Sequence, residues 1–169
     1  CPSLIKPKTK CDAIMANIDV APTLLELAGV SVPASIDGQS FVGLLKDPDS
    51  EDSWRKSLLY EYYWEPQFPQ TPSMFCLRDN RFKLIQYHGI WDTDELYDTV
   101  NDPHETRNLI REPEHNQRVS QMRQQLHQRL KETNGLVIPL GFKRTHGSNR
   151  RRAVGSTRAE FPTYFNDHE

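Results

Sequence analysis

The residues of this chain that could do chemistry are its six histidines and three cysteines. The histidines are scattered, and no His-Glu-x-x-His pair, Gly-x-Ser-x-Gly elbow or phosphate loop occurs. Cys1, Cys11 and Cys76 form no Cys-x-x-Cys pair and no even disulfide framework, which favours isolated thiols. His88 stands apart because it ends a strand-like run beside Gly89, where its side chain could face a cleft. The pattern predicts no catalytic residue and one histidine that could bind a substrate.

Aromatic residues gather in the run Tyr60-Glu61-Tyr62-Tyr63-Trp64, directly before a loop with three prolines. In a strand, alternation puts Tyr60, Tyr62 and Trp64 on one face and Glu61 and Tyr63 on the other. Such a surface could hold sugar rings, while charged groups bind hydroxyls and anions, or it could be a packing contact of the sheet. From their positions on these loops and strand ends we predict six substrate contacts: Tyr63, Trp64, Thr71, Arg78, Tyr87 and His88.

Charged clusters give no clear metal or nucleic-acid site. Four carboxylates crowd one loop and strand, but their spacing is not that of an EF-hand, so a solvated acidic loop is the simpler interpretation. A basic run at 150–152 lacks interleaved aromatic residues and does not favour nucleic acid, although it could contact an acidic surface or a sulfated sugar. The carboxylates are Asp92, Asp94, Glu95 and Asp98, and the basic residues are Lys143, Arg144, Arg150, Arg151, Arg152 and Arg158.

Strand-like runs at 55–63, 73–78, 81–88 and 95–99 predict about four antiparallel strands, with Asp79-Asn80 as a two-residue hairpin turn. A helix is predicted from Pro113 to about Thr133, because apolar residues recur on one stripe. This stripe can cover one face of a small sheet, so the expected fold class is α+β with helix-on-sheet packing. The stripe consists of Val119, Met122, Leu126 and Leu130.

The first part of the chain predicts a second helical region. Asp19 is a candidate N-cap, Val20, Leu24 and Leu27 recur at helical spacing, and Gly29 suits the position after a helix end. A short helix is expected over 41–45. Residues 136–169 are rich in Arg, Gly, Ser and Pro and predict an extended tail.

Composition sets broad limits. A length of 169 residues suits one domain, and the net charge of −2 gives no general attraction to nucleic acid or anionic membrane. No apolar run reaches the roughly 20 residues that span a bilayer. The chain does not begin with Met, so we expect a fragment whose compartment cannot be read from it.

Several segments occur in an order that resembles the C-terminal region of the type I sulfatases of the alkaline phosphatase superfamily, most closely the N-sulfoglucosamine sulfohydrolases. Each segment is weak alone, and together they are specific across about residues 13–110. They are the helix at 18–29, Asp37-Gly38-Gln39-Ser40, Trp54-Arg55, the strand at 81–85, and the stretch from Glu95 to Leu109 with its Leu-Tyr-Asp, Asn-Asp-Pro and Asn-Leu pattern.

The resemblance implies the end of an α/β catalytic core at 1–53, a subdomain with an antiparallel sheet and a long helix at 54–135, and the tail at 136–169. It implies a hydrolase of sulfate esters or sulfamates on a glycan, located in the periplasm, outside the cell or in the lysosome of a eukaryote. The family uses a formylglycine made within Cys/Ser-x-Pro-x-Arg, and usually Ca²⁺. No cysteine here fits that motif, Ser31-Val32-Pro33-Ala34 is followed by Ser35 instead of Arg, and Asp79-Asn80 lies in a turn. We therefore expect no cofactor in this chain and no activity from it alone.

Under this resemblance the small sheet and the proline loop would line a wall of the substrate pocket, and the chain would pack on its own upstream catalytic core. Two alternatives stay open. The chain could belong to a related phosphonate or phosphate monoester hydrolase, or it could be a glycan-binding remnant without catalysis. No nucleic acid or membrane partner is expected.

Overall fold

The computed structural model describes residues 5, 7–8, 10–48, 50, 53–65, 68, 70–88, 93–139 and 158–160. The chain divides into two compact units, Cys1–Ser57 and Leu58–Glu169. No helix in the described part of the chain is long and apolar enough to cross a membrane.

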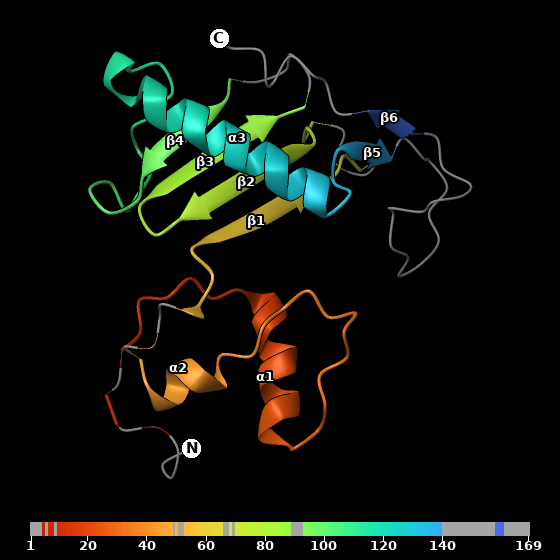
Figure 1. The fold of residues 1–169 in the computed structure, drawn as a ribbon. Helices are drawn as coiled ribbons and strands as arrows, with labels where there is room; N and C mark the ends of the chain where they lie inside the picture. The colour runs from red at the N-terminus through yellow and green to blue at the C-terminus, as the bar shows by residue number, and fades with distance from the viewer. Residues whose placement is uncertain are drawn as a thin grey trace. The chain divides into compact units, whose positions relative to one another are not determined.

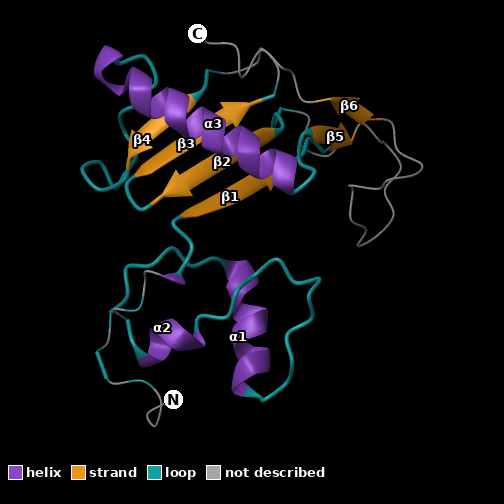
Figure 2. Ribbon diagram, viewed as in Figure 1, coloured by secondary structure: helices purple, strands orange, loops and turns teal. Residues whose placement is uncertain are grey.

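A four-stranded sheet forms the larger unit, and its strands follow chain order in space: β1 (Ser57–Tyr62), β2 (Met74–Asp79), β3 (Phe82–Tyr87) and β4 (Glu95–Asp98). Figure 2 shows the strands side by side. β2 and β3 pair antiparallel, as do β3 and β4, which confirms the predicted sheet. Because Arg78 pairs with Lys83, the tight turn lies at Asn80-Arg81, one residue later than predicted.

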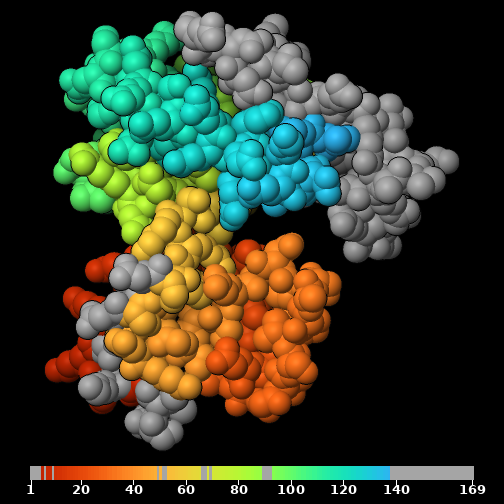
Figure 3. Space-filling model, in the orientation of Figure 1, coloured from red at the N-terminus to blue at the C-terminus, as the bar shows by residue number. Residues whose placement is uncertain are grey.

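The helix α3 (Asn116–Glu132) follows the 3-10 turn η3 (Pro113–His115) and lies across one face of this sheet (Figure 1). In the space-filling view its side chains cover much of that face (Figure 3). The predicted stripe is the buried side of the helix, and each fully buried Leu or Met stabilises the fold by about 1.5–3 kcal/mol. The core it closes consists of Phe75, Leu77, Phe82, Leu84, Leu96, Leu109, Val119, Met122, Leu126 and Leu130.

The predicted α+β architecture, a small antiparallel sheet packed by a long helix, is therefore present. Alternation leaves Lys83, Ile85 and Tyr87 of β3 on the face away from α3, where they are half-buried. At the far end of α3, Asn134 takes a left-handed backbone (φ 57°), and Gly135 lies so close to Glu61 of β1 that a Cβ would collide with that carboxylate. The turn that follows α3 therefore packs directly against β1.

Polar contacts organise the smaller unit, which contains the 3-10 turn η1 (Asn17–Asp19), α1 (Val20–Leu27) and α2 (Val42–Lys46). Asp19 precedes α1 as predicted, but its side chain makes no cap hydrogen bond. Instead its fully buried carboxylate accepts hydrogen bonds from the backbone N–H groups of Ala16 (2.8 Å) and Gln39 (2.9 Å), and from both terminal nitrogens of Arg55 (2.8 and 2.5 Å). The N-cap prediction was wrong about this side chain because a distant cation and two backbone donors use the same oxygens.

Thr23 extends this polar cluster, since its hydroxyl donates to Asp19 O (2.6 Å) and accepts from the Phe41 N–H (3.1 Å). Gly29 has φ 69° after α1, which confirms the predicted helix end. The apolar stripe of α1, in contrast, faces outward within this unit: Val20, Leu24 and Leu27 are 47%, 61% and 47% exposed.

The part of 136–169 that the structure describes contains two short strands, β5 (Val137–Pro139) and β6 (Arg158–Glu160), which pair antiparallel. The basic residues at 143, 144 and 150–152 lie outside the described residues, as do residues 140–142 and 161–169.

Candidate functional site at one end of the sheet

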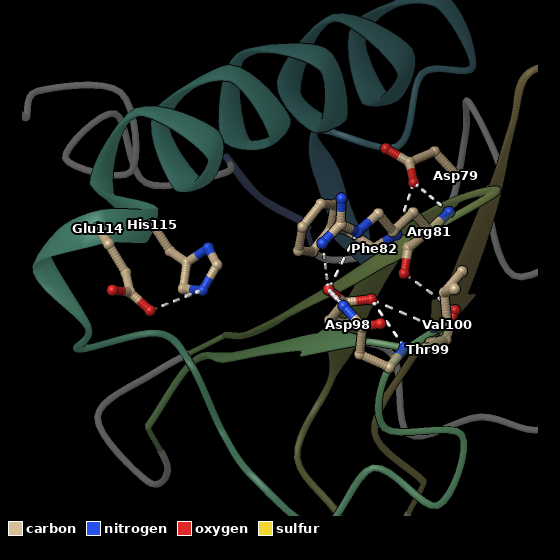
Figure 4. Close-up of polar contacts among 9 residues, drawn as sticks. Asp79, Arg81, Phe82, Asp98, Thr99, Val100, Glu114 and His115 are labelled. Atoms are coloured by element: carbon tan, nitrogen blue, oxygen red, sulfur yellow. Dashed lines mark hydrogen bonds and ion pairs between the residues drawn. The ribbon is translucent and has the colours of Figure 1, made fainter.

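The acidic stretch that begins at β4 is built into turns. Asp98 accepts hydrogen bonds from Arg81 Nε (3.0 Å) and NH2 (2.7 Å), from the N–H groups of Val100 and Asn101, and from Asn101 Nδ2. The hydrogen bonds from Arg81 and Asn101 lower the pKa of the Asp98 carboxyl to about 2. Figure 4 shows this arrangement, with Thr99 bonded back to the Arg81 carbonyl (N···O 2.8 Å). The group holds the end of β4 to the β2–β3 turn.

Asp79 also serves a turn. Its Oδ1 accepts from the N–H groups of Arg81 (2.8 Å) and Phe82 (2.6 Å), so this carboxylate closes the hairpin (Figure 4). Nearby, His115 contacts the Phe82 ring and lies 3.6 Å from Glu114 at the start of the α3 region. The Asp79 carboxylate is therefore used by the hairpin turn.

Further along the stretch, two side chains satisfy backbone donors. Asp102 Oδ2 accepts from the N–H groups of Thr106 (2.7 Å) and Arg107 (2.9 Å), and Asn108 Oδ1 accepts from Leu96 and Ile110 (both 3.0 Å). The Leu-Tyr-Asp, Asn-Asp-Pro and Asn-Leu pattern is therefore a structural signature, because its polar side chains fix the path from β4 to α3.

The opposite end of the sheet, where β1 and β3 finish and β2 begins, gathers several of the predicted contact residues, and we call it the Ser73 end. The Ser73 hydroxyl accepts a hydrogen bond from Trp64 N (2.7 Å), and the Ser73 carbonyl accepts one from His88 N (2.8 Å). Tyr87 pairs with Met74, the next residue of β2. One buried serine thus holds the predicted contacts Trp64 and His88 on either side of β2.

The other predicted contacts differ in their surroundings. Thr71 lies in the loop before β2, where its N–H donates to the Phe68 carbonyl (3.0 Å), and it is half-buried. Tyr63 packs on the core with its ring edge against Phe75 (81° between ring planes), and its hydroxyl donates to Glu61 (2.9 Å). Trp64 is 39% exposed. Tyr63 is therefore held by the core and by Glu61, whereas Trp64 is partly exposed.

The structure does not bring Arg78 together with these residues. Arg78 is exposed near the turn and pairs with Lys83, four residues along β2 from the Met74–Tyr87 pair. At about 3.3 Å per residue this is a separation of roughly 13 Å along the strand. One small ligand group cannot contact both His88 and Arg78 at that spacing.

Sequence reasoning missed the polar residues that hold the Ser73 end. Ser73 gave no periodic signal, although a small polar residue between a proline loop and a strand could have been flagged. Glu95 accepts hydrogen bonds from the hydroxyls of Tyr87 (2.8 Å) and Tyr97 (2.7 Å) on the face away from α3. Glu95, one carboxylate of the predicted acidic loop, is therefore held by two tyrosine hydroxyls.

Electrostatics limit the chemistry here. Burial lowers the pKa of the His88 imidazole, which favours a neutral ring at pH 7. Burial also raises the pKa of the Cys76 thiol to about 11, so this thiol stays protonated and is a poor nucleophile. Burial and the Glu95 hydrogen bond raise the pKa of Tyr97 to about 12. The arrangement can bind and orient a ligand, and nothing in it generates a nucleophile.

A formylglycine or divalent cation does not fit the described residues. Among them, no group of three His, Cys, Asp or Glu side chains is placed to hold a metal ion. Cys76 lies inside β2, away from any Cys-x-Pro-x-Arg motif, and the Asp79 carboxylate is used by the hairpin.

Three comparisons identify the family. The chain is 33% identical over 132 residues to the N-acetylglucosamine-6-O-sulfatase of Bacteroides thetaiotaomicron. The aligned segment covers 78% of this chain and 24% of the relative. It is 30% identical over 108 residues to the multifunctional alkaline phosphatase superfamily protein PehA of Trinickia caryophylli, over 57% of this chain and 20% of that one. The chain thus spans about a quarter or less of the length of these relatives.

A solved structure of a protein in complex with its substrate, D-glucosamine-2-N,6-O-disulfate, superposes with a TM-score of 0.66 and 34% identity. The superposition covers 79% of this chain and 26% of that one. The sequence profile described as N-sulphoglucosamine sulphohydrolase, C-terminal, matches residues 1–132. These matches confirm the resemblance drawn from the sequence: the chain belongs to the N-sulphoglucosamine sulphohydrolase C-terminal family and is a C-terminal region of the sulfatase type.

Proposed function

We propose that this chain is the C-terminal part of a sulfatase that hydrolyses sulfate esters or sulfamates on a glycan, in the periplasm or outside the cell, or in the lysosome of a eukaryote. The observation that carries the proposal is the likeness to a protein bound to a disulfated glucosamine, at 34% identity over 79% of this chain. The family match over residues 1–132 supports it. Hydrolysis of the sulfate ester or sulfamate would depend on a formylglycine and Ca²⁺ held by an upstream domain.

Within that enzyme the Ser73 end would form one wall of the substrate pocket. Trp64 would pack on a sugar ring, and the neutral His88 ring would exchange a hydrogen bond with a hydroxyl or sulfate oxygen. Thr71 and the hydroxyl of Tyr63 would complete this wall, and Tyr87, whose side chain lies on the face away from α3, would contact the substrate from that face. Arg78, roughly 13 Å along β2, would reach only a more distant sugar or sulfate of a longer glycan. Such a wall sets which leaving group fits, since specificity arises from differential contacts to the reacting complex.

The smaller unit supports the proposal that the chain packs on an upstream α/β core. Its apolar residues Val20, Leu24 and Leu27 are 47–61% exposed in a regular helix, and Ile18 and Met15 beside them are 44% and 40% exposed. A contiguous apolar surface of this kind marks an interaction site. The relatives are about four times longer than the matched segment, so the preceding domain is the occupant that we propose.

The test uses the full-length protein that contains this chain, assayed on glucosamine-6-sulfate, glucosamine-2-N-sulfate and the disulfated sugar. We expect sulfate release, and we expect His88→Ala to lower kcat/KM about tenfold through the loss of one substrate hydrogen bond. Arg78→Ala is the matched control on the same sheet and should change kcat/KM on a monosaccharide less than about twofold. Unchanged kcat/KM in both variants would remove the sheet from the substrate site.

The likeness to PehA, a multifunctional protein of the alkaline phosphatase superfamily, keeps open the second candidate from the sequence, a related phosphonate or phosphate monoester hydrolase. The same preparation would be assayed with the sulfate, phosphate and phosphonate monoesters of one aryl alcohol. A higher kcat/KM for the phosphonate than for any sulfated sugar would favour this second candidate. Binding of sulfated glucosamine by the 169-residue chain alone, without turnover by the full-length protein, would instead favour a glycan-binding remnant.

A further inference from the structure

A polar network on α3 reaches the Ser73 end of the sheet. Arg123, on a helix that otherwise covers the core, donates from NH2 to Asp94 Oδ2 (2.8 Å). The same carboxylate oxygen accepts from Gln86 Nε2 (3.1 Å), and the second oxygen lies 3.4 Å from the Tyr87 N–H. Three donors from two elements therefore converge on one carboxylate.

The network is sheltered. Gln86 is 2% exposed beneath α3, and the side chains of Arg123 and Asp94 are 22% and 15% exposed. Charge-assisted hydrogen bonds at this burial are stronger and less screened than surface pairs. The buried Nε of Arg123 has no hydrogen-bond partner within the described residues, so Asp94 is the acceptor that the structure gives this guanidinium.

The position of Asp94 links the helix to the predicted contacts. It lies just before β4, and its carbonyl accepts from Asn108 Nδ2 (3.1 Å), which fixes its backbone to the path that leads to α3. Its carboxylate holds Gln86 and the Tyr87 N–H at the end of β3, directly before His88. His88 itself is held from the other side by the Ser73 carbonyl (2.8 Å).

We propose that Arg123, acting through Asp94, is a positioning residue that fixes the end of β3 and so sets where Tyr87 and His88 meet the substrate. This inference depends on the proposed sulfatase function. Since Arg123 would act through Asp94 rather than touch the substrate, its loss should weaken substrate binding and leave the chemistry to groups elsewhere. The conservative Arg123→Lys retains a cation for Asp94 and should retain most of the effect.

The experiment compares Arg123→Met, Arg123→Lys and Asp94→Asn with Arg129→Met, a control on the same helix whose ion pair with Glu132 is about half exposed. In the full-length enzyme we expect KM to rise about fivefold in Arg123→Met and Asp94→Asn, with kcat changed less than about twofold. Arg123→Lys should recover at least half of this KM change, and Arg129→Met should leave both constants unchanged.

A second readout does not need activity. In ¹⁵N-labelled 169-residue chain, the amide signals of Tyr87 and His88 should shift in Arg123→Met and Asp94→Asn and not in Arg129→Met. Shifted signals with an unchanged KM would show a merely structural role and overturn the proposal, as would unshifted signals. A full-length enzyme without sulfatase activity whose Tyr87 and His88 signals still shift would instead reject the proposed function.

Discussion

The two units of this chain differ in how much of their apolar surface they bury. In Leu58–Glu169, Leu77, Leu84 and Leu126 are fully buried between sheet and helix. In Cys1–Ser57 the fully buried residues include a carboxylate, Asp19, while Leu24 is 61% exposed. The larger unit, Leu58–Glu169, closes its own apolar core. The smaller unit buries Val42, Leu44 and Trp54 as well as its polar cluster, but the apolar stripe of α1 is exposed within it.

The largest effect should come from Asp19→Ala, which breaks the centre of the smaller unit. Removal of one partner of a buried ion pair costs about 3–5 kcal/mol, because Arg55 and the N–H groups of Ala16 and Gln39 lose their acceptor. Hydrogen exchange of the α1 amides should become faster by at least about a hundredfold, while the α3 amides stay protected. Glu26→Ala, on the exposed side of α1, is the control; equal protection in both variants would contradict the central role of Asp19.

The next effect tests the larger unit. Leu126→Ala should cost about 2–5 kcal/mol of unfolding free energy, because a fully buried side chain is replaced by a cavity under α3. Urea unfolding followed by the fluorescence of the tryptophans and by α3 amide exchange measures the loss. Gln125→Ala, the exposed neighbour, should stay within about 0.5 kcal/mol of the parent chain. A loss below 1 kcal/mol for Leu126→Ala would mean that the core is not closed as described.

The same comparison explains what the sequence could predict. The stripe on α3 and the alternation in β3 gave the architecture of the larger unit, because both partners of that packing lie within the chain. The stripe on α1 has the same periodicity, yet its side chains are exposed. Helical periodicity identifies an apolar face, but it does not show which surface covers that face. Asp19 was predicted as an N-cap by residue preference, and Arg55, 36 residues later, gave no local signal.

The candidate site follows the same rule. That Trp64, Tyr87 and His88 lie near one another could be predicted from strand ends, because neighbouring antiparallel strands bring those ends together. The roles of Ser73 and Arg123 could not be predicted, because they depend on hydrogen bonds across strands and on the rotation of α3 over the sheet, although the position of Ser73 between a proline loop and a strand could have been flagged. Arg78 was grouped with His88 from its loop position, and only the β2–β3 register shows their separation.

A smaller effect should appear in acid, at the turn end of the larger unit. The folded-state pKa of Asp98 is about 2, below its ordinary value of 3.8, because Arg81 and Asn101 hydrogen-bond to the ionised form. A depressed carboxyl pKa stabilises the folded state above about pH 4, and this contribution is lost as the pH falls from about 4 to 2. Asp98→Asn should cost about 1–3 kcal/mol at pH 7 and much less at pH 2.5.

Urea unfolding at the two pH values measures this difference, with Glu114→Gln as the control because Glu114 is largely exposed and its contact with His115 is long. The control should change the unfolding free energy little at either pH. If Asp98→Asn cost the same at pH 7 and pH 2.5, the ionised carboxylate would not be the stabilising form.

The smallest effect in this chain should come from Leu24→Ala, which is matched to Leu126→Ala in chemistry and opposite in burial. With 61% of its surface exposed, Leu24 should lose no more than about 0.5 kcal/mol, and Ala is a better helix former. In the full-length protein the prediction reverses, because a Leu covered by the preceding domain should cost about 2–5 kcal/mol on truncation, as Leu126 does in both contexts. The measurement is α1 amide exchange in the 169-residue chain and in the full-length protein. A neutral Leu24→Ala in both would mean that the apolar face of α1 is left in solvent, and the proposed packing on an upstream core would fail.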